Sequence, residues 1–262
     1  MNFNIPENCI IGICDAAPLE EERKRLISTP TPFVTQDVEK RINPAKSLAT
    51  AKSVIVLGKA YNPSPTSNLS SLAYGTDYHI TIRKLLKKIA TQLKCNAHIM
   101  VDSGPLAERA FAVKAGLGFW GKNGMVISPK LGSYFNIGLL IVDIVLPYSQ
   151  AINEKCPDNC RLCLDACPNN AIGKPMDCAS YHTQKKSTLS LKEMAGQLYG
   201  CDVCQVCCPF NPKAIKLSTI DSQTIIDMSE DDFTCKFGHT AMSWRGLAHL
   251  KRNAKLFLKT QK

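Results

Sequence analysis

The chain has 262 residues, enough for one large domain or two ordinary ones, and its 45% hydrophobic and 21% charged residues are typical of a soluble globular protein. It has no apolar stretch long enough to span a membrane, and its N-terminus lacks the basic region and apolar run of a secretory signal. The net charge of +10 suits a polyanionic partner such as RNA and equally fits a generally basic, soluble surface.

The pattern of residues 1–60 predicts the start of an α/β domain, and a loop follows it. Residues 9–14 are a short apolar strand candidate, and residues 19–28 are a charged helix candidate with glutamates in its first turn. Residues 53–58 form a continuous apolar run that ends in glycine, which is typical of a central strand. The residues 62–68 are rich in proline and serine and predict a loop.

The middle of the chain predicts a helix, a strand and a second helix. Apolar residues repeat at three- and four-residue steps over residues 78–93, with basic residues on the other face, which indicates an amphipathic helix. Residues 97–101 predict a strand that ends at the turn 102–105, and in open α/β sheets ligands bind beyond such strand ends. A helix over residues 106–115 follows.

The glycine-rich residues 116–124 predict a loop after that helix. Because the glycines follow a helix and not a strand, they argue against a dinucleotide-binding fingerprint. Residues 125–128 and 134–145 are expected to complete the sheet. Residues 231–262 predict a mostly helical, basic tail.

The cysteines predict a metal-binding module. Eight of the thirteen form two groups, each ending in Cys-Pro, and Cys178 lies between the groups. The first group is Cys156, Cys160, Cys163 and Cys167, and the second is Cys201, Cys204, Cys207 and Cys208. Three closely spaced cysteines followed by a fourth before a proline are typical of two-cluster ferredoxins. In those proteins the first three cysteines bind one cluster and the fourth binds the second cluster. Metal-bound thiolates in a reducing cytoplasm fit this crowding better than disulfides.

Two zinc sites would use the same number of thiolates, but they predict separate Cys-x₂-Cys pairs and leave the repeated Cys-Pro ending unexplained. The spacing therefore favours two 4Fe–4S clusters. The ligand exchange rule suggests one set of Cys156, Cys160, Cys163 and Cys208, and a second set of Cys167, Cys178, Cys201 and Cys204. Either Cys207 or Cys208 fits the last place of the first set, and Cys208 is preferred because proline follows it.

Several separate motifs resemble those of one enzyme family, in the same order along the chain. The longest runs from Val101 to Lys122, beginning Val-Asp-Ser-Gly-Pro. The shorter ones lie at residues 53–57, 75–79, 132–135 and 199–205. Together with both cysteine groups, these motifs make the chain resemble the epoxyqueuosine reductase family over residues 10–257.

The resemblance implies a mixed α/β (α+β) fold in three parts. These are a nitroreductase-like cobalamin-binding domain over residues 1–150, a ferredoxin-like module with two 4Fe–4S clusters over residues 151–215, and a short helical basic tail over residues 216–262. Members of that family remove the epoxide oxygen from epoxyqueuosine in tRNA, and they are relatives of reductive dehalogenases. The cobalamin is expected in its base-off form, because the sequence has no Asp-x-His-x-x-Gly stretch to supply a histidine to cobalt.

In that family the aspartate of the Asp-Ser-Gly-Pro motif lies near the cobalt and is assigned as the proton donor, which here is Asp102. A carboxyl group buried beside a cofactor has a raised pKa and acts as an acid near neutrality. An ordinary turn-forming aspartate is the alternative. The candidate cobalamin contacts are Ser103, Lys114, Gly118, Trp120, Gly121, Lys122, Asn123 and Ser133.

The expected partners are a tRNA substrate and an external electron donor such as flavodoxin or ferredoxin, with no membrane and a monomeric, cytoplasmic protein. The sequence departs from the family pattern at Tyr74 and Asn123, lacks a glutamate after Gly138, and has only the first portion of the usual C-terminal helical repeats. Two alternatives are a related corrinoid and iron–sulfur reductase of another substrate, and an electron carrier that is not an enzyme.

Overall fold

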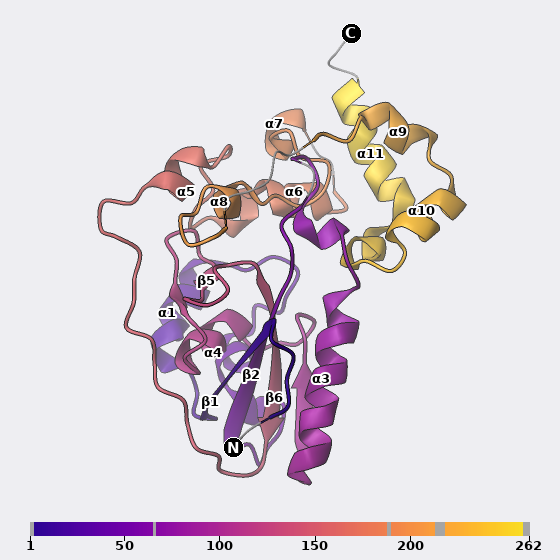
Figure 1. Cartoon of the computed structure of the whole chain (residues 1–262). Coiled ribbons are helices and arrows are strands. Elements are labelled where there is room, and N and C mark those ends of the chain that lie inside the picture. The colour runs from indigo at the N-terminus through magenta and orange to yellow at the C-terminus, as the bar shows by residue number, and fades with distance from the viewer. Residues whose placement is uncertain (1–2, 65–66, 188–189, 213–217, 259–262) are drawn as a thin grey trace. The chain divides into compact units, whose positions relative to one another are not determined.

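The computed structural model describes residues 3–64, 67–187, 190–212 and 218–258. It divides the chain into two compact units. The first unit comprises Met1–Ala60 and His79–Cys160, and the second comprises Tyr61–Tyr78 and Arg161–Lys262. Figure 1 gives the course of the chain. No helix among the described residues is long and apolar enough to cross a membrane.

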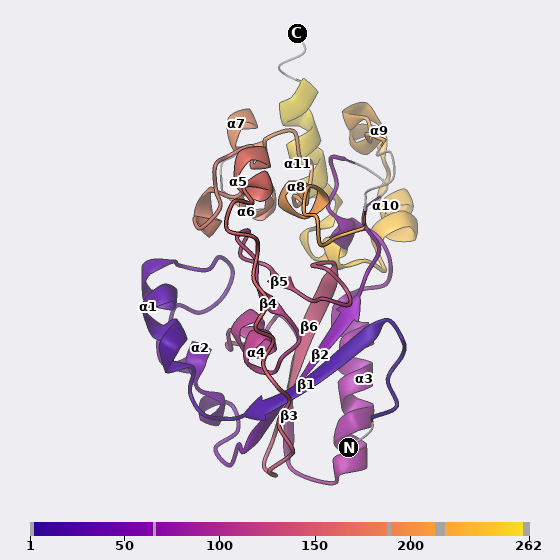
Figure 2. The same cartoon turned by 60° about the vertical axis from the view of Figure 1, so that its left-hand side comes forward.

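A four-stranded sheet forms the centre of the first unit (Figure 2). Its strands are β1 (Cys9–Asp15), β2 (Ser53–Ala60), β6 (Phe135–Val142) and β3 (Ala97–Met100), in that spatial order. Every neighbouring pair is antiparallel. The first six residues of β2 are all buried, because helices cover both faces of this interior strand.

Helices pack on both faces of this sheet. On one face lies α3 (Tyr78–Leu93), and Ile82 of α3 packs so close to Gly138 of β6 that a side chain at Gly138 would collide with it. The other face is covered by α1 (Glu20–Ser28), α2 (Val38–Ile42), the short 3₁₀ helix η1 (Pro44–Lys46) and α4 (Glu108–Lys114). The predicted amphipathic helix over residues 78–93 is confirmed.

One expectation about the sheet is wrong. Residues 125–128 do not join the main sheet, because β5 (Val126–Ile127) pairs only with β4 (Phe119–Trp120) in a separate two-stranded sheet. The rule that ligands bind beyond the carboxyl ends of parallel strands does not apply to this antiparallel sheet. A buried apolar run has the same pattern in either pairing direction, so the sequence did not distinguish the two.

The second unit is built from short helices. Around the cysteines lie α5 (Leu162–Ala166), η3 (Pro175–Asp177), α6 (Ala179–Gln184), α7 (Leu191–Met194) and α8 (Val203–Val206). After them come α9 (Ser222–Asp227), α10 (Glu230–Phe237), η4 (Ala241–Arg245) and α11 (Gly246–Leu258). These last helices share an apolar core that includes Tyr199, Phe237 and Leu250. Asn253 of α11 is fully buried, and its Nδ2 donates to the carbonyls of Thr183 (2.8 Å) and Leu198 (2.7 Å).

The segment between β2 and α3 belongs to the second unit, although its neighbours in sequence belong to the first. It contains η2 (Ser71–Ala73). The carboxylate of Asp202 accepts hydrogen bonds from the Ser70 hydroxyl (2.9 Å), the Ser71 N–H (2.7 Å) and the Ser71 hydroxyl (2.5 Å). Leu69 also forms a bridge with Tyr199. The three-part division at residues 150 and 215 remains a prediction.

Candidate functional site

Asp102 lies in the turn that follows β3. Its backbone has a φ of 56°, a left-handed conformation that aspartate tolerates better than most residues. Its side chain is 62% exposed, and Oδ2 lies 3.7 Å from Nε2 of His79 at the start of α3. The carboxylate is therefore accessible, and it has an imidazole as a neighbour.

Glu108, at the start of α4, holds this turn in place. Its Oε1 accepts a hydrogen bond of 2.7 Å from the backbone N–H of Asp102. Burial raises the pKa of the Glu108 carboxyl to about 8, and the negative charge of Asp102 adds to the rise. Sequence reasoning missed this residue, because a glutamate in the first turn of a helix resembles an ordinary helix-dipole partner.

The two lysines predicted to contact cobalamin bind protein groups. Lys114 Nζ pairs with Oδ1 of Asp15 at 2.7 Å and lies 3.3 Å from the carbonyl oxygen of Ala17. Lys122 Nζ donates to the carbonyls of Pro157 (3.0 Å), Asp158 (2.8 Å) and Cys160 (2.8 Å). Lys122 therefore anchors the loop that carries Cys156 and Cys160, the first two cysteines of the first group.

The remaining candidate contacts lie in and around the glycine-rich loop. A side chain at Gly118 would meet the carbonyl oxygen of Ile127, so glycine is needed there for the close approach of two strands. Asn123 Oδ1 accepts the N–H of Met125 at 3.1 Å. The ring of Trp120 lies beneath the guanidinium of Arg25, whose central carbon is 4.7 Å from the ring centroid. Gly121 and Ser133 are buried, whereas Ser103 is exposed beside Asp102.

The four cysteines of the second predicted set all lie in the second unit. Burial, followed by the charges of Cys178 and Cys167 among its causes, raises the pKa of Cys201 to about 12. The pKa of Cys204 is raised by its burial and by the charges of Cys201 and Cys178. The four thiols are thus close enough for their charges to interact. Such thiolates repel one another unless a cation lies between them, so this donor set fits a metal cluster.

The choice of iron–sulfur clusters over zinc rests on the repeated Cys-Pro spacing of the sequence. For the first set, Cys156 and Cys160 lie in the first unit and Cys163 and Cys208 in the second, so that assignment remains a prediction.

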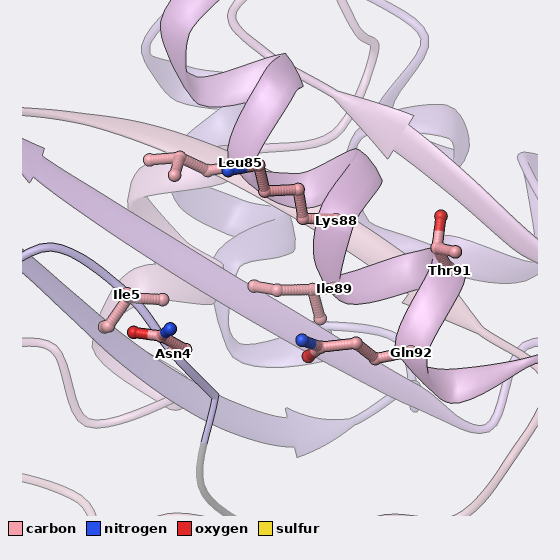
Figure 3. Close-up of a pocket in the computed structure, with 7 residues that line it drawn as sticks. All are labelled: Asn4, Ile5, Leu85, Lys88, Ile89, Thr91 and Gln92. Carbon is pink, nitrogen blue, oxygen red and sulfur yellow. The ribbon is translucent and has the colours of Figure 1, made fainter.

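A cavity of about 410 Å³ lies on the first unit, away from all predicted site residues (Figure 3). Its lining residues are Asn4, Ile5, Leu85, Lys88, Ile89, Thr91 and Gln92. It is formed by the N-terminal segment and one face of α3. None of its lining residues is a cysteine or a carboxylate, so the redox chemistry that the cysteines indicate lies elsewhere.

Two family profiles match the chain. The profile described as epoxyqueuosine reductase QueG, DUF1730, matches residues 41–103, which include Asp102. The profile described as 4Fe–4S double cluster binding domain matches residues 155–211, which include all the predicted cluster ligands.

Relatives match nearly the whole chain. The epoxyqueuosine reductase of Bacillus anthracis is 34% identical, over 95% of this chain and 76% of its own length. The chain belongs to the epoxyqueuosine reductase family. The family member of Bacillus subtilis is 33% identical, over 86% of this chain and 67% of its own length.

Solved structures of epoxyqueuosine reductases have the same fold. The Streptococcus thermophilus structure superposes with a TM-score of 0.84 at 31% identity, covering 96% of this chain and 77% of that one. A second was solved with an epoxyqueuosine-modified stem loop of a tyrosine tRNA, with a TM-score of 0.84 at 32% identity over 95% and 76% of the two chains. The predicted family, the mixed α/β fold and the double-cluster domain are thereby confirmed.

Proposed function

We propose that this protein reduces epoxyqueuosine to queuosine in tRNA, with two 4Fe–4S clusters and base-off cobalamin as cofactors. The observation that carries the proposal is the exposed carboxylate of Asp102, held in the turn after β3 beside His79, in a chain with a double-cluster domain. A Bacillus subtilis epoxyqueuosine reductase has been solved with its catalytic aspartate loop swung out of the active site. We assign the same role to the Asp102 turn of this chain.

Removing an epoxide oxygen to leave an alkene consumes two electrons and two protons and releases water. When bound, cobalamin and the clusters supply the electrons. Asp102 donates a proton from its carboxyl group to the departing oxygen. His79, with Nε2 at 3.7 Å from Oδ2, lies where it can return a proton to that carboxylate. Glu108 binds the backbone N–H of Asp102 and so fixes the orientation of the Asp102 carboxyl group.

The residues present fit these cofactors. The interacting thiols of the second unit are soft donors suited to iron. For cobalamin, Ser103 beside Asp102 and the partly exposed Trp120 and Asn123 of the glycine-rich loop would hold the corrinoid. The roles of Lys114 and Lys122 are then to position the loops around it, because their ammonium groups bind protein oxygens. We further propose a monomeric, cytoplasmic enzyme that receives electrons from a flavodoxin- or ferredoxin-type donor.

The test is conversion of epoxyqueuosine-containing tRNA by the anaerobically reconstituted protein, measured as queuosine by mass spectrometry of digested RNA. The Asp102→Asn variant should keep its iron and cobalt content and lose at least about 100-fold in turnover, because it cannot donate the proton. Full activity of this variant would remove Asp102 from the mechanism. Absence of queuosine with the parent protein fully loaded would favour a different substrate. Iron without bound cobalt would favour an electron carrier.

A further inference from the structure

The three helices α1, α2 and α4, which cover one face of the main sheet, each carry one arginine of interest (Figure 2). They are Arg25 of α1, Arg41 of α2 and Arg109 of α4. The N–H of Ala107, just before α4, donates to the carbonyl of Arg41 at 2.8 Å, and Arg25 and Arg109 both contact the glycine-rich loop. In keeping with this arrangement, the charges of Arg25 and Arg109 lower the pKa of Arg41, after the larger effect of its burial. Like charges that gather in this way need an anion among them to be favourable.

Arg41 is the most buried member of this cluster. It is only 7% exposed, and its buried Nε has no hydrogen-bond partner among the described residues. Its backbone is fixed in place, because its carbonyl accepts the N–H of Ala107 at 2.8 Å. A buried N–H donor of a charged group is costly when it has no acceptor, and an anion is the acceptor that suits it best.

Of the two other arginines, Arg25 has a carboxylate as its partner and Arg109 has a neutral acceptor. Arg25 pairs with Glu22 and stacks on Trp120. Arg109 donates to the carbonyl oxygen of Gly124 at 3.2 Å, a neutral acceptor that does not cancel its charge. Burial disfavours the negative charge of the adjacent Glu108 carboxyl and raises its pKa to about 8. The cluster therefore carries net positive charge beside the glycine-rich loop.

We infer that Arg25, Arg41 and Arg109 form a binding site for a phosphodiester group. Guanidinium groups bind phosphate oxygens through their N–H donors, and Nε of Arg41 is a donor that no described group of the protein uses. The inference rests on the proposed function, because both ligands proposed there, tRNA and cobalamin, carry their negative charge as phosphodiesters. In tRNA the group belongs to the backbone, and in cobalamin it belongs to the nucleotide loop.

The experiment measures binding and not turnover, so its outcome is separate from that of the proposed function. The full-length protein with reconstituted clusters is titrated with three probes: an anticodon stem-loop RNA, cobalamin, and cobinamide, which lacks the nucleotide loop and its phosphodiester. The variants are Arg41→Gln and Arg109→Gln. The control is Lys84→Gln, which removes one positive charge from an exposed position on α3 of the same unit.

The expected result is a loss of about ten-fold or more in affinity for one phosphodiester ligand, as for removal of a charged hydrogen bond. One outcome is weaker RNA binding with unchanged cobalamin binding. If the slope of log affinity against log salt concentration also falls by the amount expected for about one phosphate contact, the RNA backbone occupies the site. Weaker cobalamin binding with unchanged cobinamide binding would place the nucleotide loop there.

The inference is overturned if both variants bind all probes as the Lys84→Gln protein does, if cobalamin and cobinamide binding fall equally, or if the parent protein binds neither ligand. Iron content and thermal unfolding establish that each variant is folded. If Arg41→Gln does not fold, the exposed Arg109→Gln variant decides the question by itself.

Discussion

The Glu108→Gln variant should be more stable than the parent protein in alkaline solution, and the difference should shrink toward acid pH. The amide oxygen of glutamine can still accept the N–H of Asp102, but the side chain has no charge to bury. Burial raises the pKa of the Glu108 carboxyl from its ordinary 4.5 to about 8. The stability contributed by this group is thus complete below pH 4.5 and is lost as the pH rises through 8.

The size of the effect follows from that pKa. Each pH unit between the two values is worth about 1.4 kcal/mol, so full ionisation costs about 5 kcal/mol as an upper limit. Because Glu108 is partly exposed, solvent screens part of this cost. Between pH 6 and pH 9, the difference in unfolding free energy between variant and parent should widen by about 1–2 kcal/mol.

The assay is anaerobic urea unfolding followed by far-ultraviolet circular dichroism at both pH values. Glu7→Gln removes an exposed carboxylate from the same unit and corrects for the loss of one charge. A difference between Glu108→Gln and the parent that is the same at pH 6 and pH 9 would refute the reasoning. It would mean that the carboxyl of Glu108 is solvated in the folded protein.

Three further substitutions test other contacts. Lys122→Met removes the donor to three loop carbonyls and should lower the amount of iron that the protein retains after gel filtration. If the variant retains as much iron as the parent protein, the cysteine loop does not need Lys122 to keep its conformation. Asn253→Leu removes two buried hydrogen bonds and leaves the Leu198 carbonyl without its amide donor, while the Thr183 carbonyl keeps its contact with His249. It should lower the unfolding free energy by about 1–3 kcal/mol in urea, and a loss below about 0.5 kcal/mol would contradict this. Cys204→Ser should lose about half of the iron by metal analysis, and unchanged iron content would exclude Cys204 as a ligand.

The sequence predicted those features that depend on local patterns. The helical period identified α3, the apolar run identified β2, and the repeated Cys-Pro spacing identified the double-cluster domain. Each pattern is complete within a short stretch of chain, so no tertiary information was needed.

The features that escaped prediction depend on contacts between distant segments. The contact of Lys122 with the cysteine loop joins residues that are far apart in sequence, and a glycine-rich loop gives no sign of it. The role of Glu108 depends on the left-handed turn at Asp102 and on burial of a carboxyl, both of which the fold decides. The burial of Arg41 Nε without an acceptor likewise depends on the tertiary structure and not on the local sequence.

The assignment of residues 61–78 to the second unit has a consequence for synthesis of the protein on the ribosome. The partners of this segment begin at Arg161, about 80 residues later, and Asp202 is later still. At about 5–20 residues per second, the segment waits roughly 4–16 s or more after its own translation. During that interval its serines and Leu69 have no native surface to bind, so nascent-chain chaperones would meet an open insertion within an otherwise folding sheet domain.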